Sequence, residues 1–156
     1  MNVVKEEKAE PVAKEKIDRN TVSADSSDSN DVSSSIQEVY NEDYLLKNGI
    51  DYNKGVELLG DLDTYKNTLS DWYKECHQKF EDMKLSKLKH DMPNYAIAVH
   101  ALKSDSKYFG FDKLASMSYE HEMKSKANDQ EYVDSNFSNL EREFIRTTII
   151  VEKYLK

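Results

Sequence analysis

The sequence predicts an all-α protein, and three features carry that prediction. Glycine and proline, which punctuate turns, occur only four and two times in 156 residues. After residue 40, apolar residues recur at spacings of three and four, as on the buried face of a helix. The connections between the periodic segments are short, which makes neighbouring helices antiparallel. We therefore expect an antiparallel up-down-up-down four-helix bundle with a short N-terminal cap helix.

The first two helices are expected in the segment from Asn53 to Lys89. Asn53 is suited to cap a short helix, KGVELL, which Gly60 ends. The next helix runs from about Leu62 to Met83 or on to Lys89. Its core-facing stripe is expected to comprise Tyr65, Leu69, Trp72, Tyr73, Cys76, Phe80 and Met83.

The remaining three helices are expected to begin at the acidic N-caps Asp91, Asp112 and Asp129. Pro93 fits the first turn of the helix after Asp91, because its missing N–H costs nothing there. That helix runs to about Phe109, and Gly110 is its natural stop. The inward positions of the last two helices are expected to be Leu114, Met117, Ser118, His121, Val133, Phe137, Leu140, Phe144, Thr148, Val151 and Leu155.

Residues 1–39 differ in composition from the rest of the chain. They contain no aromatic residue and no glycine, and they include the tract TVSADSSDSNDVSSS. Such a segment cannot bury enough apolar surface to offset the entropy that it loses on ordering. We expect residues 1–39 to be a disordered Ser/Asp-rich tail or linker and residues 40–156 to form the folded domain.

The charge and cysteine content restrict the partners and the compartment. Thirty acidic residues against 22 Lys and Arg give a formal net charge of −8, which does not favour binding to nucleic acid. We find no apolar run of about 18 residues and no signal-peptide pattern, so we expect no membrane span. The single cysteine, Cys76, is typical of a core residue in a reducing compartment. We therefore expect a cytoplasmic protein without a metal or cofactor.

The helix from Asp91 to Phe109 carries a histidine on its outward face. Its buried stripe is expected to be Tyr95, Ala98, Val99, Leu102, Ser106 and Phe109, and its outward residues Ala96, His100, Lys103, Ser104 and Lys107. The small side chains of Ala96 and Ser104 leave room for another protein to approach His100. By periodicity alone, His100 fits an ordinary surface histidine. It also fits a phosphate acceptor, because neutral imidazole is a nucleophile and Lys103 is placed to meet a phosphoryl group.

The segment AIAVHALKSDSKYFGFDKLASMSYEHE resembles the signature of histidine phosphotransfer (HPt) domains. That pattern is a phosphorylated histidine, a lysine three residues on, a small residue next, glycine at ten, leucine at fourteen and a Leu-Glu-like pair at about twenty-one and twenty-two. It falls here on His100, Lys103, Ser104, Gly110, Leu114, His121 and Glu122. Upstream, GIDYNKGVELLGDLDTYKNTLSDW is similar to the family's opening, so the resemblance spans about residues 41–156. Ser104 stands where glycine is frequent, and His121 replaces an apolar residue.

The resemblance implies a phosphocarrier rather than an enzyme. His100 would accept a phosphoryl group at Nε2 from a receiver-domain aspartate and pass it to another receiver. Glu122 would hold Nδ1, and Lys103 would assist electrostatically. The receiver would contact the exposed residues Ala96, Ser104 and Lys107. The implied partners are response-regulator receiver domains and a (hybrid) sensor histidine kinase, with the protein itself a monomer that has no ATP-binding motif.

Two other interpretations remain open. One is that the chain is a C-terminal or substrate HPt module of a larger hybrid kinase, phosphorylated in cis. Alternatively, it is a non-phosphorylated helical adaptor that binds receivers through the same face, although an adaptor has no need for the His100, Lys103 and Glu122 set. Outside this site, we expect Tyr108 and Tyr119 to be packing residues, and Ile145 and Ile149 either to cover the cap helix or to form a second contact surface.

Overall fold

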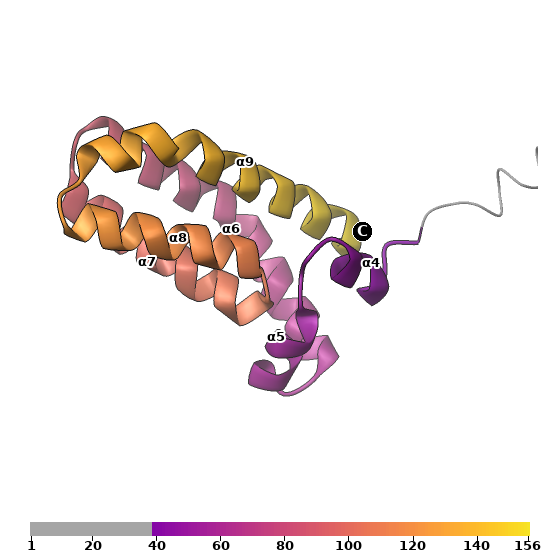
Figure 1. The fold of residues 1–156 in the computed structure, drawn as a ribbon. Coiled ribbons are helices and arrows are strands. Elements are labelled where there is room, and N and C mark those ends of the chain that lie inside the picture. Colours follow the sequence, from indigo (N-terminus) through magenta and orange to yellow (C-terminus); the bar gives the residue numbers. More distant parts are fainter. Residues whose placement is uncertain (1–38) are drawn as a thin grey trace, which may run out of the picture. The chain divides into compact units, whose positions relative to one another are not determined.

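The computed structural model of the protein describes residues 39–156, and the regular secondary structure in this range is helical (Figure 1). This confirms the predicted all-α class. The predicted disordered tail lies outside the described residues, apart from Val39. Six helices pack together, namely α4 (Glu42–Lys47), α5 (Tyr52–Leu59), α6 (Leu62–Leu88), α7 (Met92–Phe109), α8 (Asp112–Lys126) and α9 (Gln130–Leu155).

The four longest helices contact one another in a closed ring. Helix α6 packs against α7 and α9, and α8 packs against the same two helices. Helices α7 and α8 lie side by side over most of their length (Figure 1). The two short helices lie at the end of α9 where the C-terminus is, with α4 against α9 and α5 against α6 and α7.

The sequence predicted one short helix before the long ones, whereas the structure has two. Helix α4 has only six residues, which is too short for an apolar period to reveal it. The residue types at its start indicate a helix instead. Asn41 caps α4 by accepting a hydrogen bond from the Tyr44 amide, and the acidic residues Glu42 and Asp43 lie in its first turn.

Two of the predicted N-caps are wrong. Helix α5 already includes Asn53 as its second residue, and its N-cap is Asp51. Helix α8 includes Asp112 as its first residue, after Phe111. The carboxylate of Asp112 instead pairs with Lys54 at 2.9 Å, which ties α8 to α5.

Other predicted boundaries are confirmed. The side chains of Asp91 and Asp129 accept hydrogen bonds from amides three residues on, as N-caps do. Gly110 ends α7 in the left-handed conformation, with φ of +83°. A Cβ at this position would collide with the carbonyl of Asp51, whose amide donates to the Gly110 oxygen at 2.9 Å. Gly110 is therefore required both by the turn and by the close approach of the loop before α5.

The core matches the predicted stripes of α6, α8 and α9 closely. The predicted inward residues of these helices are buried, except that Tyr73, Met117 and Leu155 are partly exposed. Aromatic rings join the helices, with Phe80 stacked on Phe144 at 4.1 Å between centroids. Cys76 is buried, and this burial raises the pKa of its thiol to about 12.

Several predicted surface and packing positions are wrong. Ala96 is 6% exposed and buried, whereas Ala98 is only partly buried. The reason is that α7 packs most closely on α8, which turns Ala96 inward and lets the two backbones approach. Tyr108 and Tyr119 are 43% and 46% exposed rather than packed in the core. Ile145 and Ile149 are each about half exposed, at 48% and 47%, which agrees with either of the two roles expected for them.

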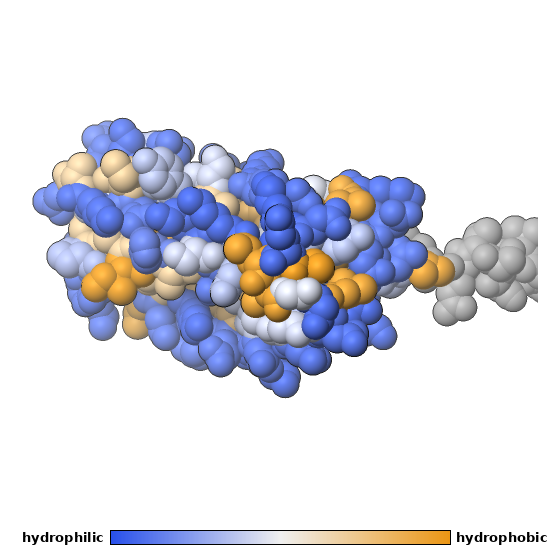
Figure 2. All heavy atoms as spheres, turned by 90° about the horizontal axis from the view of Figure 1, so that it is seen from below, coloured by the Kyte–Doolittle hydropathy of each residue, from blue (hydrophilic) through white to orange (hydrophobic). Residues whose placement is uncertain are grey.

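The surface is mainly hydrophilic, with separate groups of apolar side chains (Figure 2). The largest group on the face drawn lies at the place of α5 in Figure 1, and Leu58 of that helix is 62% exposed. Within the described range, the helices all lack the length or the hydropathy that crossing a lipid bilayer requires.

Candidate functional site

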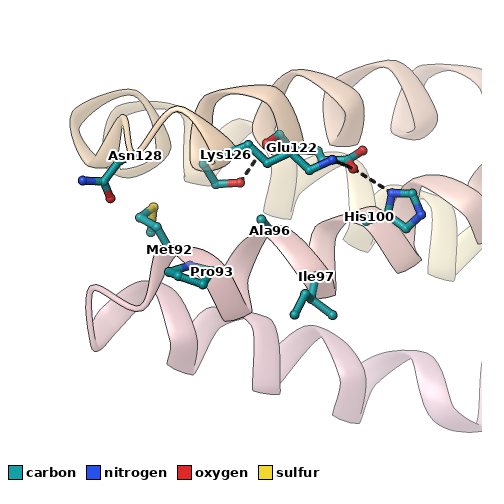
Figure 3. A pocket seen from close by; sticks show the side chains of 9 residues that line it. Met92, Pro93, Ala96, Ile97, His100, Glu122, Lys126 and Asn128 are labelled. Carbon is teal, nitrogen blue, oxygen red and sulfur yellow. Dashed lines mark hydrogen bonds and ion pairs between the residues drawn. The ribbon is translucent and has the colours of Figure 1, made fainter.

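His100 lies in the middle of α7, on the side next to α8. Its side chain is 56% exposed, as the sequence predicted. It is therefore held on a rigid element, away from frayed helix ends, and is open to another molecule on one side (Figure 3).

Glu122 approaches His100 from α8. Its carboxylate oxygen Oε2 lies 2.7 Å from His100 Nδ1, although the two residues are 22 positions apart. The Glu122 side chain is only 3% exposed. The structure thus brings together the two residues that the sequence placed in one site.

Two lysine ammonium groups also contact the Glu122 carboxylate. Lys103 Nζ lies 2.7 Å from Oε1, and Lys126 Nζ lies 2.8 Å from Oε2. Sequence reasoning placed Lys103 on a solvated face, but its side chain is only 15% exposed because it covers Glu122. The prediction from sequence also missed Lys126. The pattern that could have revealed it is its i,i+4 spacing from Glu122 on one helix.

These contacts fix the charge of Glu122. Burial alone raises the pKa of this carboxyl, but the contacts from Lys103, Lys126 and His100 outweigh it and lower the pKa to about 2. Glu122 is therefore ionised at neutral pH and can only accept a hydrogen bond. His100 Nδ1 must then carry the proton, which leaves the lone pair of the neutral ring on Nε2.

The ring nitrogen Nε2 points away from Glu122 (Figure 3). Among the described residues, no hydrogen bond or ion pair to this atom is formed. The arrangement leaves a nucleophilic nitrogen with a fixed tautomer, backed by a buried negative charge that stabilises a positive ring.

A groove of about 670 Å³ opens beside His100, between the start of α7 and the end of α8 (Figure 3). Ala96 lines it, although it is buried and not on the exposed face that the sequence predicted. Ile97, at the edge of the groove, is 68% exposed. Its remaining lining residues are Met92, Pro93, Glu122, Ser125, Lys126 and Asn128.

The other predicted site residues divide into two groups. Ser104 and Lys107 are exposed on α7, and Lys107 lines a separate hollow of about 500 Å³ with Tyr119. Gly110 and Leu114 are buried and serve the turn and the core. Within the described structure, the predicted site residues that hydrogen bonds and ion pairs join to one another are His100, Lys103 and Glu122.

His121, next to Glu122, faces the core instead of the site. It is 2% exposed, and a hydrogen bond of 2.8 Å joins its Nδ1 to the Tyr95 hydroxyl. Burial lowers the pKa of His121 to about 4, so this ring is neutral at physiological pH.

The described part of the chain contains no cluster of three or more His, Cys, Asp or Glu side chains placed to hold a metal ion. No family model, no curated protein and no solved structure matches the chain. The chemistry of the site is therefore inferred from its own residues.

Proposed function

We propose that the protein is a histidine phosphotransfer protein of a multistep phosphorelay, phosphorylated on His100. In this proposal α6, α7, α8 and α9 form an antiparallel four-helix bundle, and α4 and α5 cap one of its ends. The closed ring of contacts among the four long helices supports that arrangement. The HPt-like residues of the sequence lie on α7 and α8 and, for Gly110, in the turn between them.

One observation carries the proposal. His100 donates from Nδ1 to an ionised, buried Glu122, while its side chain is 56% exposed and Nε2 points outward. An ordinary surface histidine has no need of a buried carboxylate, because desolvating that charge is costly. Holding one tautomer and stabilising a positive ring are what a phosphoryl acceptor needs.

The transfer follows from this geometry. The Nε2 lone pair attacks the phosphorus of an aspartyl phosphate on a receiver domain, forming the N–P bond as the P–O bond to the aspartate breaks. The aspartate leaves as a carboxylate. The ring keeps its proton on Nδ1 and becomes positively charged, and Glu122 stabilises that charge. In the reverse direction a second receiver aspartate attacks the same phosphorus.

The surroundings of His100 fit a protein partner. The groove supplies apolar surface at Ile97 and Ala96, and Ser104 and Lys107 are exposed on the same helix. We propose that a response-regulator receiver domain docks here and that a sensor histidine kinase supplies the phosphate upstream. The same bundle serves equally as a module of a larger hybrid kinase, and the same groove would serve a helical adaptor.

Phosphoryl transfer from phosphorylated receiver domains tests the proposal. The receivers are mixed with the protein, with His100→Gln and with His90→Asn, and acid-labile phosphate on the chain is followed. His90 is an exposed histidine with φ of +57° in the turn after α6, a conformation that asparagine tolerates, so His90→Asn is the matched control. We expect transfer to the wild type and to His90→Asn but none to His100→Gln. Transfer to His100→Gln would move the site, and binding without transfer would favour the adaptor.

A further inference from the structure

The carboxylate oxygen that holds the His100 ring is shared with a lysine. Glu122 Oε2 lies 2.7 Å from His100 Nδ1 and 2.8 Å from the Lys126 ammonium. The two partners come from different helices, His100 from α7 and Lys126 from α8, one turn after Glu122. Lys126 therefore acts on the Nδ1 side of the ring, whereas Nε2 points away from Glu122 (Figure 3).

A buried carboxylate next to an imidazole has two opposing effects on a nucleophilic ring. It fixes the proton on the nearer nitrogen, which leaves the lone pair on the other nitrogen. It also attracts a second proton, because a negative charge at hydrogen-bond distance favours the charged form of the ring. A ring that is protonated on both nitrogens has no lone pair and cannot attack phosphorus. The site needs the first effect and must limit the second.

The charges around Glu122 limit the attraction of a second proton. Lys103 Nζ lies 2.7 Å from Oε1 and Lys126 Nζ 2.8 Å from Oε2, so two positive charges face one negative charge before the ring is counted. Among the described residues, Glu122 is the one carboxylate that forms a hydrogen bond or ion pair with His100.

The other titratable groups near this part of α7 are engaged elsewhere. His121, next to Glu122 on α8, faces the core and is bonded to Tyr95. The ring of Tyr119, also on α8, contacts Lys103. Paired lysines on the other helices that pack on α7 are Lys79 with Glu75 and Lys84 with Glu141 on α6, and Lys54 with Asp112 on α5. The balance of charge at the ring is therefore set by Glu122 and its two lysines.

We infer that Lys126 is a positioning residue that offsets the charge of Glu122 on the Nδ1 side, so that His100 keeps a free lone pair on Nε2 at physiological pH. This inference rests on the proposed function. Lys126 is suited to the role because it contacts Oε2 and not the reacting nitrogen, and its side chain is 60% exposed. The role that the HPt resemblance implies for Lys103, toward the phosphoryl group, is separate from this one.

The pH profile of chemical phosphorylation tests this inference without any receiver. Nε2 attacks phosphoramidate, and the new N–P bond forms as the P–N bond of the reagent breaks and ammonia leaves. Phosphohistidine that is absent from His100→Gln is assigned to His100. The rate falls toward low pH as the ring takes up its second proton. We expect Lys126→Gln to move this fall to higher pH by about half a pH unit, and Lys126→Arg to restore the wild-type profile.

Lys124→Gln is the matched control for the loss of a positive charge. Lys124 lies on the same helix, but its ammonium lies over the Tyr132 ring, 5.2 Å from the centroid. We expect this variant to leave the profile unchanged. The titration of phosphoramidate itself is common to all variants, so a difference between profiles belongs to the protein. Long-range ¹H–¹⁵N NMR of the unphosphorylated ring follows the same protonation without the reagent.

An unshifted profile in Lys126→Gln would overturn the inference. An equal shift in Lys124→Gln, or a shift that Lys126→Arg does not reverse, would overturn it as well, because the contact with Oε2 would then not be the cause. The proposed function is decided separately. Failure of receivers to phosphorylate the wild type would contradict that function, whereas the protonation of the ring would still report on Lys126.

Discussion

At the residue level, the site depends on one carboxylate that is buried and fully ionised. Glu122 is held in this state by positive charge on both of its oxygens, and it decides which nitrogen of His100 carries the proton. In the proposed function, the exposed ring is the reacting group. The enclosed glutamate and its lysines would then set the tautomer and the charge with which that ring reacts.

Replacing Glu122 by alanine tests the role of this carboxylate. The change removes the acceptor for Nδ1, so the neutral ring samples both tautomers and loses the charge that stabilises its phosphorylated form. We expect transfer from a phosphorylated receiver to slow by about a hundredfold, measured as the rate of phosphohistidine formation. Glu120→Ala, an exposed glutamate two residues earlier, is the matched control. An unchanged rate in Glu122→Ala would contradict the role assigned to Glu122.

His121 gives the fold a pH dependence of its own. Its pKa is lowered from 6.5 to about 4 by burial, so the unfolded chain binds more protons than the native chain between these values. Stability is therefore fully present above about pH 6.5 and falls as the pH drops toward 4, by about 3 kcal/mol in total. Urea unfolding followed between pH 7 and pH 4 measures this loss.

The variant His121→Asn separates this effect from other titrations. Asparagine keeps an acceptor near the Tyr95 hydroxyl and does not titrate. We expect a lower stability at pH 7 but a flatter dependence between pH 6.5 and 4. Glu122, with its pKa lowered from 4.5 to about 2, contributes stability that is lost only as the pH falls below about 4.5. A loss of equal size in His121→Asn would contradict the assignment.

At the level of the elements, the end of α7 is fixed by a single glycine. Gly110 adopts a positive φ, and the Asp51 carbonyl lies where its Cβ would be. We expect Gly110→Ala to lower the free energy of unfolding by about 2 kcal/mol or more, since strain and collision add. Gly60→Ala is the control, because Gly60 has φ of +106° and open space around its Cβ. Chemical denaturation that found equal losses in both variants would exclude the close approach as a cause.

Much of the element structure could be predicted, and the failures have physical causes. The stripes of α6 and α9 run along helices of 27 and 26 residues, and so the period identified their buried faces. Helix α4 is too short to show a period. Asp112 has the chemistry of a cap, but the helix begins one residue earlier than a cap at Asp112 requires, and its carboxylate pairs with Lys54. Ala96 and Ala98 are both small, so only the close packing of α8 could show which one is buried.

The site was predictable to a similar degree. Spacing placed His100 outward, and the resemblance to a known pattern placed Glu122 beside it. Neither could show that Lys103 is enclosed, because that depends on the position of α8 and of Tyr119. Lys126 lies outside the pattern, and its contact with Glu122 arises from ordinary helix spacing.

At the level of the whole molecule, a cluster of aromatic rings connects the long helices. Trp72 on α6 contacts Phe109 at the end of α7, Phe111 before α8 and Phe144 on α9, with ring centroids 5.1 to 6.5 Å apart. One side chain on α6 thus touches α7, α9 and the residue that precedes α8. The platform that carries His100 is therefore held by packing that extends well beyond α7.

Phe144 tests the weight of this cluster. Phe144→Ala removes a buried ring that stacks on Phe80, and we expect a loss of about 3–5 kcal/mol in the free energy of unfolding. Ile145→Ala, next in sequence and half exposed, should cost far less. The fluorescence of Trp72 and the far-UV circular dichroism should change together in one transition. Separate transitions would show that the helices do not unfold as one unit.

The central claim is that His100 carries the phosphoryl group on Nε2 while Glu122 holds Nδ1. Long-range ¹H–¹⁵N NMR of the imidazole rings, recorded on the protein after phosphorylation by a receiver, tests it most directly. The account predicts phosphorus coupling at Nε2 of His100 and a proton retained on Nδ1. Phosphorylation at Nδ1, or on another histidine, would contradict it.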